Sequence, residues 1–251
     1  MLKKIRELIG QAPGRIARDA GEYWSASRDD AGKRSLSHWR GEGAWTDEQR
    51  WLGIGRANRA SFECLRHFAG EEGPFATMAE WGPGGGSNAL AFLPEFSTCH
   101  GIDISAANLE ECARQLAREG RQGFQAHLFP AETPEVIRDR IAEPLDFFLS
   151  TAVFQHFPGK EYGATVTRLA FDLLRPGGLA LIQTRFDDGN ERFRPRRANY
   201  RENAVTFTSY ALEEFWDVAE QAGFEPLYVT LVRKTNYASY ALRRPRCQDM
   251  L

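Results

Sequence analysis

The chain lacks several features that would assign it to a whole class of proteins. No apolar run approaches the ~20 residues that a membrane-spanning helix needs, and the basic N-terminus has no long apolar segment of the kind found in secretory signals. Lysine and arginine (32) nearly balance aspartate and glutamate (34), which leaves a net charge of −2. Such a balance creates no general attraction to nucleic acid or to anionic membranes. We therefore expect neither as a partner.

Cysteine is scarce and scattered. The four cysteines (Cys64, Cys99, Cys112 and Cys247) include no pair at the spacing of metal ligands. Isolated thiols are typical of proteins in a reducing compartment. We predict a cytoplasmic protein without a bound metal. The length of 251 residues suits one domain with an appendage, or two small domains.

Residues 75–88 form the most informative stretch of the chain. Its first residues, 75–79, are apolar and suit a buried strand, a glycine cluster follows, and a helix is expected from Ser87. A strand, a glycine-rich turn and a helix are the arrangement with which doubly wound α/β folds hold a nucleotide-like ligand. The spacing is G-x-G-x-G, whereas a dinucleotide fingerprint would need Gly or Ala at Ser87. Taken alone, the glycines could also form an ordinary loop.

A second strand with an acid at its tip supports a nucleotide-like ligand. Residues 98–104 are expected to form this strand, and Asp103 follows Gly86 by 17 residues (103 − 86). This is close to the offset at which an acid meets ribose hydroxyls. The two motifs together predict a ligand that contains a ribose.

Four motifs in order resemble those of the class I S-adenosylmethionine-dependent methyltransferases. Residues 80–86 resemble the first motif of this superfamily, Asp103 its ribose-binding acid, residues 146–151 its fourth-strand motif, and residues 173–182 its helix end and fifth strand. The resemblance covers roughly residues 75–242. It implies an α/β fold with a doubly wound, mostly parallel seven-stranded sheet and a C-terminal antiparallel hairpin. It also implies S-adenosylmethionine as cofactor and S-adenosylhomocysteine as product.

The resemblance also implies which residues bind the cofactor. Glu80 is expected at the methionine amino end or in support of the loop, Asp103 at the ribose, and Ile104 on the adenine. Glu132 departs from the usual register after the third strand, and it could instead be a charge at the start of a helix expected over 133–141. The full predicted set is Glu80, Gly82, Gly84, Gly86, Asp103, Ile104, Glu132, Ser150 and Thr151.

Alternating patterns and turn signals predict the remaining core elements. Strands are expected at 124–129, 145–149, 179–184, 227–232 and 237–242, with helices at 160–174 and 210–222. Residues 175–178, Arg-Pro-Gly-Gly, are expected to end the first of these helices. A terminal antiparallel hairpin disfavours a nicotinamide-binding fold, whose sheet usually ends in parallel fashion.

We expect two parts in the chain. Residues 1–72 lack strand patterns and hold most of the tryptophans, so we interpret them as a helical, aromatic-rich lid; aromatic anchoring of an irregular segment is the alternative. Residues 73–251 are expected to form the methyltransferase domain, with an arginine-rich insertion at about 185–204. The insertion is either a solvated loop or a flap that grips an anionic acceptor through arginine.

The candidate catalytic residues are His156, after the fourth strand, and His38, in the lid. Either imidazole could take a proton from the acceptor, although His156 could equally pack at the start of the next helix. The substrate-binding candidates are Tyr23, Trp24, Trp39, Phe154, Arg194 and Arg197.

These features predict a methyltransferase acting on a small molecule, with oxygen as the favoured acceptor atom. The acceptor is expected to be hydroxylated or anionic, and a homodimer is left open. The alternatives are nitrogen or carbon methylation, a protein or RNA acceptor, a nicotinamide-dependent oxidoreductase, and a non-catalytic module that only binds the cofactor.

Overall fold

A seven-stranded sheet forms the centre of the computed structural model, which describes residues 10–246. The strand order is β3-β2-β1-β4-β5-β7-β6. Strands β1 to β5 pair in parallel, and β7 pairs antiparallel with both β5 and β6. This confirms the predicted α/β fold with its C-terminal hairpin. The strands are β1 (Thr77–Trp81), β2 (Thr98–Asp103), β3 (Phe124–Leu128), β4 (Leu145–Ser150), β5 (Leu174–Arg185), β6 (Glu225–Val232) and β7 (Tyr237–Arg243).

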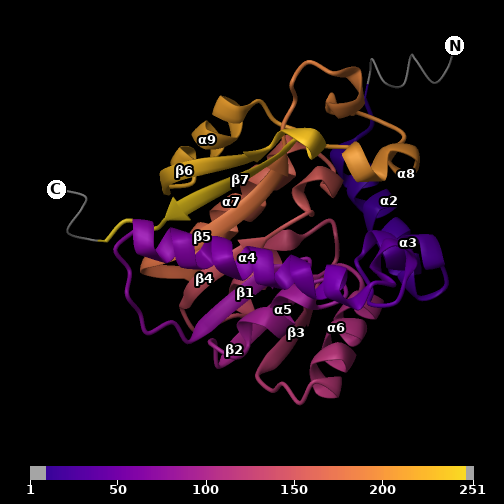
Figure 1. The fold of residues 1–251 in the computed structure, drawn as a ribbon. Coiled ribbons are helices and arrows are strands. Elements are labelled where there is room, and N and C mark those ends of the chain that lie inside the picture. Colours follow the sequence, from indigo (N-terminus) through magenta and orange to yellow (C-terminus); the bar gives the residue numbers. More distant parts are fainter. Residues whose placement is uncertain (1–9, 247–251) are drawn as a thin grey trace, which may run out of the picture.

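Helices cover both faces of the sheet and complete a three-layer arrangement (Figure 1). One face packs against α4 (Glu48–Phe68), α5 (Ser87–Phe92) and α6 (Ala106–Arg118). The other packs against α7 (Lys160–Leu173), α9 (Leu212–Gln221) and the short 3₁₀ helix η3 (Pro134–Asp139). Within residues 10–246, no helix combines the length and the apolar character needed to cross a membrane.

Two predicted boundaries differ from the structure because hydrogen bonds are made elsewhere. The strand expected at 75–79 lies at 77–81, since the backbone N–H groups of Ala76 and Thr77 donate to the Asp146 carboxylate (2.7 and 2.9 Å). The strand expected at 179–184 begins earlier, because residues 175–178, which were expected only to end the preceding helix, belong to β5. There Gly177 N–H donates to the Arg244 carbonyl (2.8 Å), and Arg244 N–H donates to the Gly178 carbonyl (2.9 Å). The helix expected over 133–141 is only the 3₁₀ helix η3.

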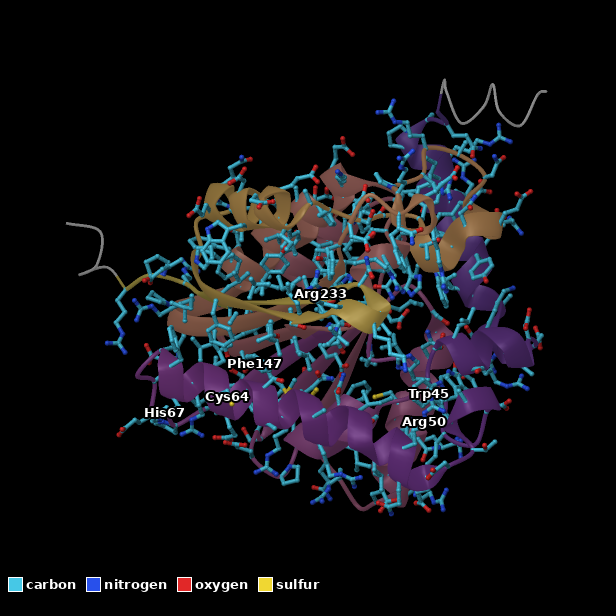
Figure 2. All side chains as sticks on the ribbon, turned by 45° about the horizontal axis from the view of Figure 1, so that its top comes forward. Trp45, Arg50, Cys64, His67, Phe147 and Arg233 are labelled. Carbon is cyan, nitrogen blue, oxygen red and sulfur yellow. The ribbon has the colours of Figure 1, made fainter. Side chains whose placement is uncertain are left out.

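The N-terminal part divides differently from the predicted lid of residues 1–72. Residues 1–9 lie outside the described residues. The segment 10–47, hereafter the lid, contains α2 (Pro13–Ser25), η1 (Ala26–Arg28), α3 (Ala31–Leu36) and η2 (Gly43–Trp45). Helix α4 is instead a core element, because Trp51, Phe62 and Leu65 are fully buried against the sheet. The ring centroid of Phe62 lies 4.5 Å from that of Phe147, which Figure 2 labels on the sheet side of α4.

The predicted insertion packs against the lid. It contains η5 (Glu191–Phe193), α8 (Tyr200–Asn203) and η6 (Ala204–Thr206). Figure 1 shows α8 beside α2, and the two share a small apolar cluster. Its buried members are Ile16, Ala20, Tyr200, Ala204 and Phe207. Two segments distant in sequence therefore form one cover over the same end of the sheet.

Candidate active site

One cavity lies at the carboxyl ends of the central strands. Its walls come from the ends of β1 and β2, the loop after β4, the first turn of α5 and the lid. In the sheet order, the chain direction of the crossovers reverses between β1 and β4, and open α/β sheets bind ligands at this switch point. The position of the cavity thus follows from the topology.

The glycine-rich loop is packed closely by the protein itself. A Cβ on Gly84 would lie 2.4 Å from the Ser37 carbonyl oxygen, and one on Gly85 would lie 2.2 Å from the His38 carbonyl oxygen. Gly85 N–H also donates to the Ser37 carbonyl (2.8 Å). The loop therefore needs glycine at these positions so that the lid backbone can pack against it. This role adds to the one inferred from the sequence, in which the glycines allow a ligand to approach closely.

Glu80 carries a buried and half-satisfied carboxylate. Its Oε1 accepts from Asn88 Nδ2 (2.7 Å), whereas Oε2 is buried without a hydrogen-bond partner in residues 10–246. Burial, together with the nearby Asp103, raises the pKa of Glu80 to about 8. An unpaired buried oxygen of this kind suits a ligand that brings a positive charge or hydrogen-bond donors.

Asp103 is held at the tip of β2. Its Oδ1 accepts from Ser105 N–H (2.8 Å) and its Oδ2 from Asn108 Nδ2 (3.3 Å). Burial raises the pKa of Asp103 to about 6 against these hydrogen bonds. Trp39 Nε1 of the lid donates to Asn108 Oδ1 (2.9 Å). The amide of Asn108 therefore links the lid to Asp103.

His156 lines the cavity, but both of its ring nitrogens already have partners. Nδ1 lies 2.6 Å from the Ala204 carbonyl, which can only accept, so Nδ1 carries the proton. Nε2 accepts from the Gln155 side-chain amide (3.2 Å). Burial lowers the pKa of His156 to about 4, so the ring is neutral near pH 7. These contacts favour the packing role that the sequence left open.

His38 also lines the cavity, and its ring nitrogens have no hydrogen-bond partner among the described residues. The residue adopts a left-handed backbone (φ 57°), which Trp51 Nε1 stabilises by donating to the His38 carbonyl (2.7 Å). The His38 ring packs on that of Trp45 (4.4 Å between centroids), and the Arg50 guanidinium covers the same indole (5.3 Å; Figure 2). Burial lowers the pKa of His38 to about 4.

Most of the residues predicted to bind the cofactor meet at this cavity. Those that line it are Glu80, Gly82, Gly84, Asp103, Ile104 and Thr151. Gly86 lies just outside, where its left-handed backbone (φ 86°) begins α5 against Cys112. Ser150 is buried, with its hydroxyl 3.3 Å from the Trp81 carbonyl. Glu132 lies away from the cavity and pairs with Arg18 (3.6 Å).

The structure brings only one of the predicted substrate-binding residues, Trp24, to the cavity wall. Tyr23 packs behind it against Tyr200, and Phe154 is fully buried in the core. Trp39 fastens the lid to Asn108, as described above. The insertion residues Arg194 and Arg197 are not cavity-lining residues. The lid contacts both the insertion and the glycine loop.

Several cavity residues were not predicted. Asn88 lies in the first turn of α5, directly after the glycine loop, and that placement could have suggested that its side chain faces the acid of β1. Asn58 is not a lining residue itself and gave no such signal, because it comes from α4 and reaches Asn88 Oδ1 (2.9 Å) only in the folded chain. The other lining residues that sequence reasoning missed include Ala20, Leu36, Ser37, Asn108, Phe129 and Tyr162.

Comparison with known families finds a match for the middle of the chain. Residues 79–180 match a family described as a methyltransferase domain. This range runs from β1 to β5 and includes the glycine loop, Asp103 and the loop after β4. None of the curated proteins compared with the chain matches it.

Solved structures of methyltransferases share the fold at low sequence identity. The N-methyltransferase NodS from Bradyrhizobium japonicum aligns with a TM-score of 0.55 and 13% identity, over 75% of this chain and 97% of NodS. NodS in complex with S-adenosylhomocysteine aligns with a TM-score of 0.54 and 13% identity, over 75% of this chain and 87% of that one. An S-adenosylmethionine-dependent methyltransferase from Clostridium acetobutylicum aligns with a TM-score of 0.55 and 11% identity, over 68% and 85% of the two chains.

Proposed function

We propose that the chain, which matches a methyltransferase domain over residues 79–180 and shares its fold with S-adenosylmethionine-dependent methyltransferases, is an S-adenosylmethionine-dependent enzyme that methylates a hydroxyl group of a small molecule. We further propose that His38 takes up the hydroxyl proton. When bound, S-adenosylmethionine supplies a methyl group carried on a positively charged sulfur. The observation that carries the proposal is the position of His38. His38 lines the cavity, its carbonyl lies beside the glycine loop, and both of its ring nitrogens are without a partner in residues 10–246.

The cavity residues fit the cofactor group by group. Glu80 Oε2, buried and unpaired, suits an ammonium group or hydroxyl donors. The Asp103 carboxylate suits ribose hydroxyls, and Ile104 offers an apolar surface to a base. The unpaired oxygen is the strongest part of this fit, because residues 10–246 offer it no other partner.

His38 is better suited to an oxygen acceptor than to an amine. With a pKa of about 4, its imidazole is neutral at pH 7 and can accept a proton. A hydroxyl becomes a strong acid as its oxygen bonds to the incoming methyl, so a weak base is sufficient. An alkylammonium group has an ordinary pKa of about 10, and a base with the pKa of His38 cannot deprotonate it.

The cover over the cavity supports a small acceptor. Ser37 contacts the glycine loop directly, and Trp24 Nε1 donates to the Tyr200 hydroxyl of α8 (3.0 Å). A protein or RNA acceptor would have to displace both the lid and the insertion. We keep a cytoplasmic location as part of the proposal, supported by the free thiols of Cys64, Cys99 and Cys112.

The test is a comparison of His38→Asn with His156→Asn. Asparagine tolerates the left-handed backbone at position 38, so the lid should keep its conformation. We expect His38→Asn to lower kcat about 100-fold without changing the affinity for S-adenosylhomocysteine. Formation of S-adenosylhomocysteine would be measured with a panel of hydroxylated compounds and matched amines.

His156→Asn is the control for this experiment. It leaves His38 in place, so kcat should fall by less than about tenfold, although stability should fall because the Ala204 carbonyl loses its donor. The proposal is wrong if His38→Asn retains the wild-type kcat, or if the panel shows methylation of amines alone.

A further inference from the structure

We propose that the acceptor is an uncharged aromatic compound and that the cavity discriminates against carboxylated analogues. The inference rests on the proposed function and names the substrate class of the same site. It comes from the charges and the aromatic side chains that the folded chain places on the cavity wall. Neither could be assigned before the lid and the loop after β4 were seen together.

The cavity wall carries no positive side chain. Its only carboxylates are those of Glu80 and Asp103, at the ends of β1 and β2, and neither lysine nor arginine occurs among its lining residues in the described part of the chain. A carboxylate or phosphate on the acceptor would therefore lose its hydration without gaining a cationic partner, and it would approach two acids. Burial of an unpaired charge is costly, whereas an uncharged acceptor avoids this cost.

Three arginines of the insertion contact other parts of the insertion or the lid. Arg192 lies over the ring of Phe193 (5.4 Å), and Arg196 Nη2 donates to the Glu191 carbonyl (3.1 Å). Arg201 pairs with Asp19 and with Glu22 of α2, so it fastens the insertion to the lid.

Arg185, at the end of β5, is the arginine whose charge reaches His156, where it lowers the pKa of the imidazole. Its guanidinium nevertheless points away from the wall. Nη1 donates to the Thr235 carbonyl (2.7 Å) and Nη2 to the Tyr237 hydroxyl (3.0 Å). The same guanidinium lies 4.3 Å from the centre of the Tyr237 ring. Arg185 is thus held by the β6–β7 turn and is not presented to an acceptor.

Aromatic side chains from the lid, from the loop after β4 and from α7 also line the cavity. The Trp24 ring meets the His156 ring edge to face (4.7 Å), and the Phe157 ring lies 4.9 Å from that of Tyr162. Trp24 is fixed by the Tyr200 hydroxyl, which in turn donates to the His156 carbonyl (2.6 Å). Rigid aromatic walls of this kind favour a planar apolar ligand, because ring contacts add to the burial of apolar area.

Tyr162 supplies a neutral polar group to the same wall. Its ring is partly buried and lines the cavity, and its hydroxyl has no hydrogen-bond partner among the described residues. A hydroxyl or carbonyl group of an uncharged acceptor would satisfy it.

The experiment measures binding of three probes to the full-length protein saturated with S-adenosylhomocysteine. The probes are naphthol, naphthoate and decalol, the fully hydrogenated counterpart of naphthol, each titrated by calorimetry near neutral pH. We expect naphthol to bind about tenfold or more tightly than naphthoate, because the carboxylate is buried unpaired. It should also bind about tenfold more tightly than decalol, which lacks the aromatic face.

Two variants of cavity residues test whether naphthol binds in this cavity. Trp24→Leu should weaken naphthol about tenfold, whereas Trp216→Leu, outside the cavity on α9, should leave it unchanged. Tyr162→Phe keeps the ring and removes only the hydroxyl, so it should weaken naphthol a few-fold. A circular dichroism spectrum and a thermal melt of each variant would separate lost contacts from lost structure.

Three results would overturn the inference. Naphthoate could bind as tightly as naphthol, decalol could bind as tightly as naphthol, or S-adenosylhomocysteine could bind while all three probes fail. Each of these leaves the proposed function standing, because that function depends on the effect of His38→Asn on turnover. Conversely, wild-type turnover by His38→Asn would show that His38 is not the base. The affinities of the probes do not depend on that result.

Discussion

At the scale of single residues, Glu80 dominates the electrostatics of the cavity. Its side chain is 1% exposed, and Asn88 satisfies only one of the two carboxylate oxygens. Asn58 in turn donates to Asn88 from α4, so a core helix orients the amide that holds the acid. The Glu80 side chain is thus held in position for a ligand. Without a ligand its burial disfavours the charged carboxylate.

The direction of the pKa shift determines how stability and binding depend on pH. Folding raises the pKa of Glu80 from 4.5 to about 8, so the folded chain holds this proton more tightly than the unfolded chain. The resulting stabilisation is complete below the unfolded pKa and is lost as the pH rises through the folded pKa. A ligand that pairs with the carboxylate favours the charged form, so its binding should strengthen over the same range and release a proton.

Glu80→Gln tests this linkage. In the wild-type protein we expect S-adenosylhomocysteine to bind about tenfold or more tightly near pH 8 than near pH 6, and Glu80→Gln should bind it with little pH dependence. The Tm of ligand-free wild type should fall over this range by more than the Tm of the variant. Glu63→Gln, on the exposed side of α4, is the control and should match wild type. If Glu80→Gln kept the wild-type pH dependence of S-adenosylhomocysteine binding, another titrating group would be responsible for it.

At the scale of elements, side chains of the lid contact α6 and the residue that follows it. Arg28 pairs with Glu110 (2.5 Å), Trp39 donates to Asn108 (2.9 Å), and Arg40 pairs with Glu119 (2.8 Å). The two ion pairs are exposed on the carboxylate side, so each contributes little. The Trp39 contact matters more, because Asn108 is buried and also binds Asp103.

Trp39→Phe should therefore loosen the lid while preserving the aromatic ring. The buried Asn108 oxygen loses its donor, which costs about 1–3 kcal/mol, and we expect S-adenosylhomocysteine to dissociate about tenfold faster. Stopped-flow fluorescence would measure the rate. Trp216→Phe is a matched control, since its indole donates to Glu220 (3.1 Å) within α9 and far from the lid. Equal dissociation rates in the two variants would show that this contact does not hold the lid closed.

At the scale of the whole molecule, α4 forms an edge of the hydrophobic core, with one side buried against the sheet and the other exposed. Phe62 is fully buried among Phe75, Phe92, Phe96 and Phe147, which come from four other parts of the chain. Phe68 lies six residues later in the same helix and is 63% exposed. The helix is thus apolar toward the sheet and tolerant of change on its outer side.

This contrast predicts two different costs in one helix. Phe62→Ala should lower the free energy of unfolding by about 3–5 kcal/mol, because it removes a ring from a close-packed cluster. Phe68→Ala should lower it by less than about 1 kcal/mol. Equilibrium urea denaturation would measure both. Similar values for the two variants would mean that α4 belongs to a separate N-terminal unit, as the sequence had suggested.

The sequence by itself determined the fold and the cofactor end of the site. The strand–glycine–helix pattern around Gly82, the acid at Asp103 and the terminal hairpin are local signals, because each depends on residues that are neighbours in the chain. The structure confirms the mostly parallel seven-stranded sheet and the hairpin, and it places Glu80, Asp103 and Ile104 at one cavity. The glycine turn and the acid at a strand end are local patterns, whereas the number of strands and the roles of Glu80 and Ile104 were implied by the resemblance to the class I methyltransferases.

Only the tertiary structure decided the acceptor end. Trp24 and Tyr23 are adjacent in α2, yet one lines the cavity and the other packs behind it against Tyr200. Arg194 and Arg197 stay away from the cavity because α8 docks on the lid and not on the glycine loop. Contacts between segments more than a hundred residues apart depend on how the layers of the fold pack. No local pattern in the sequence therefore indicates which side chains these contacts bring to the cavity wall.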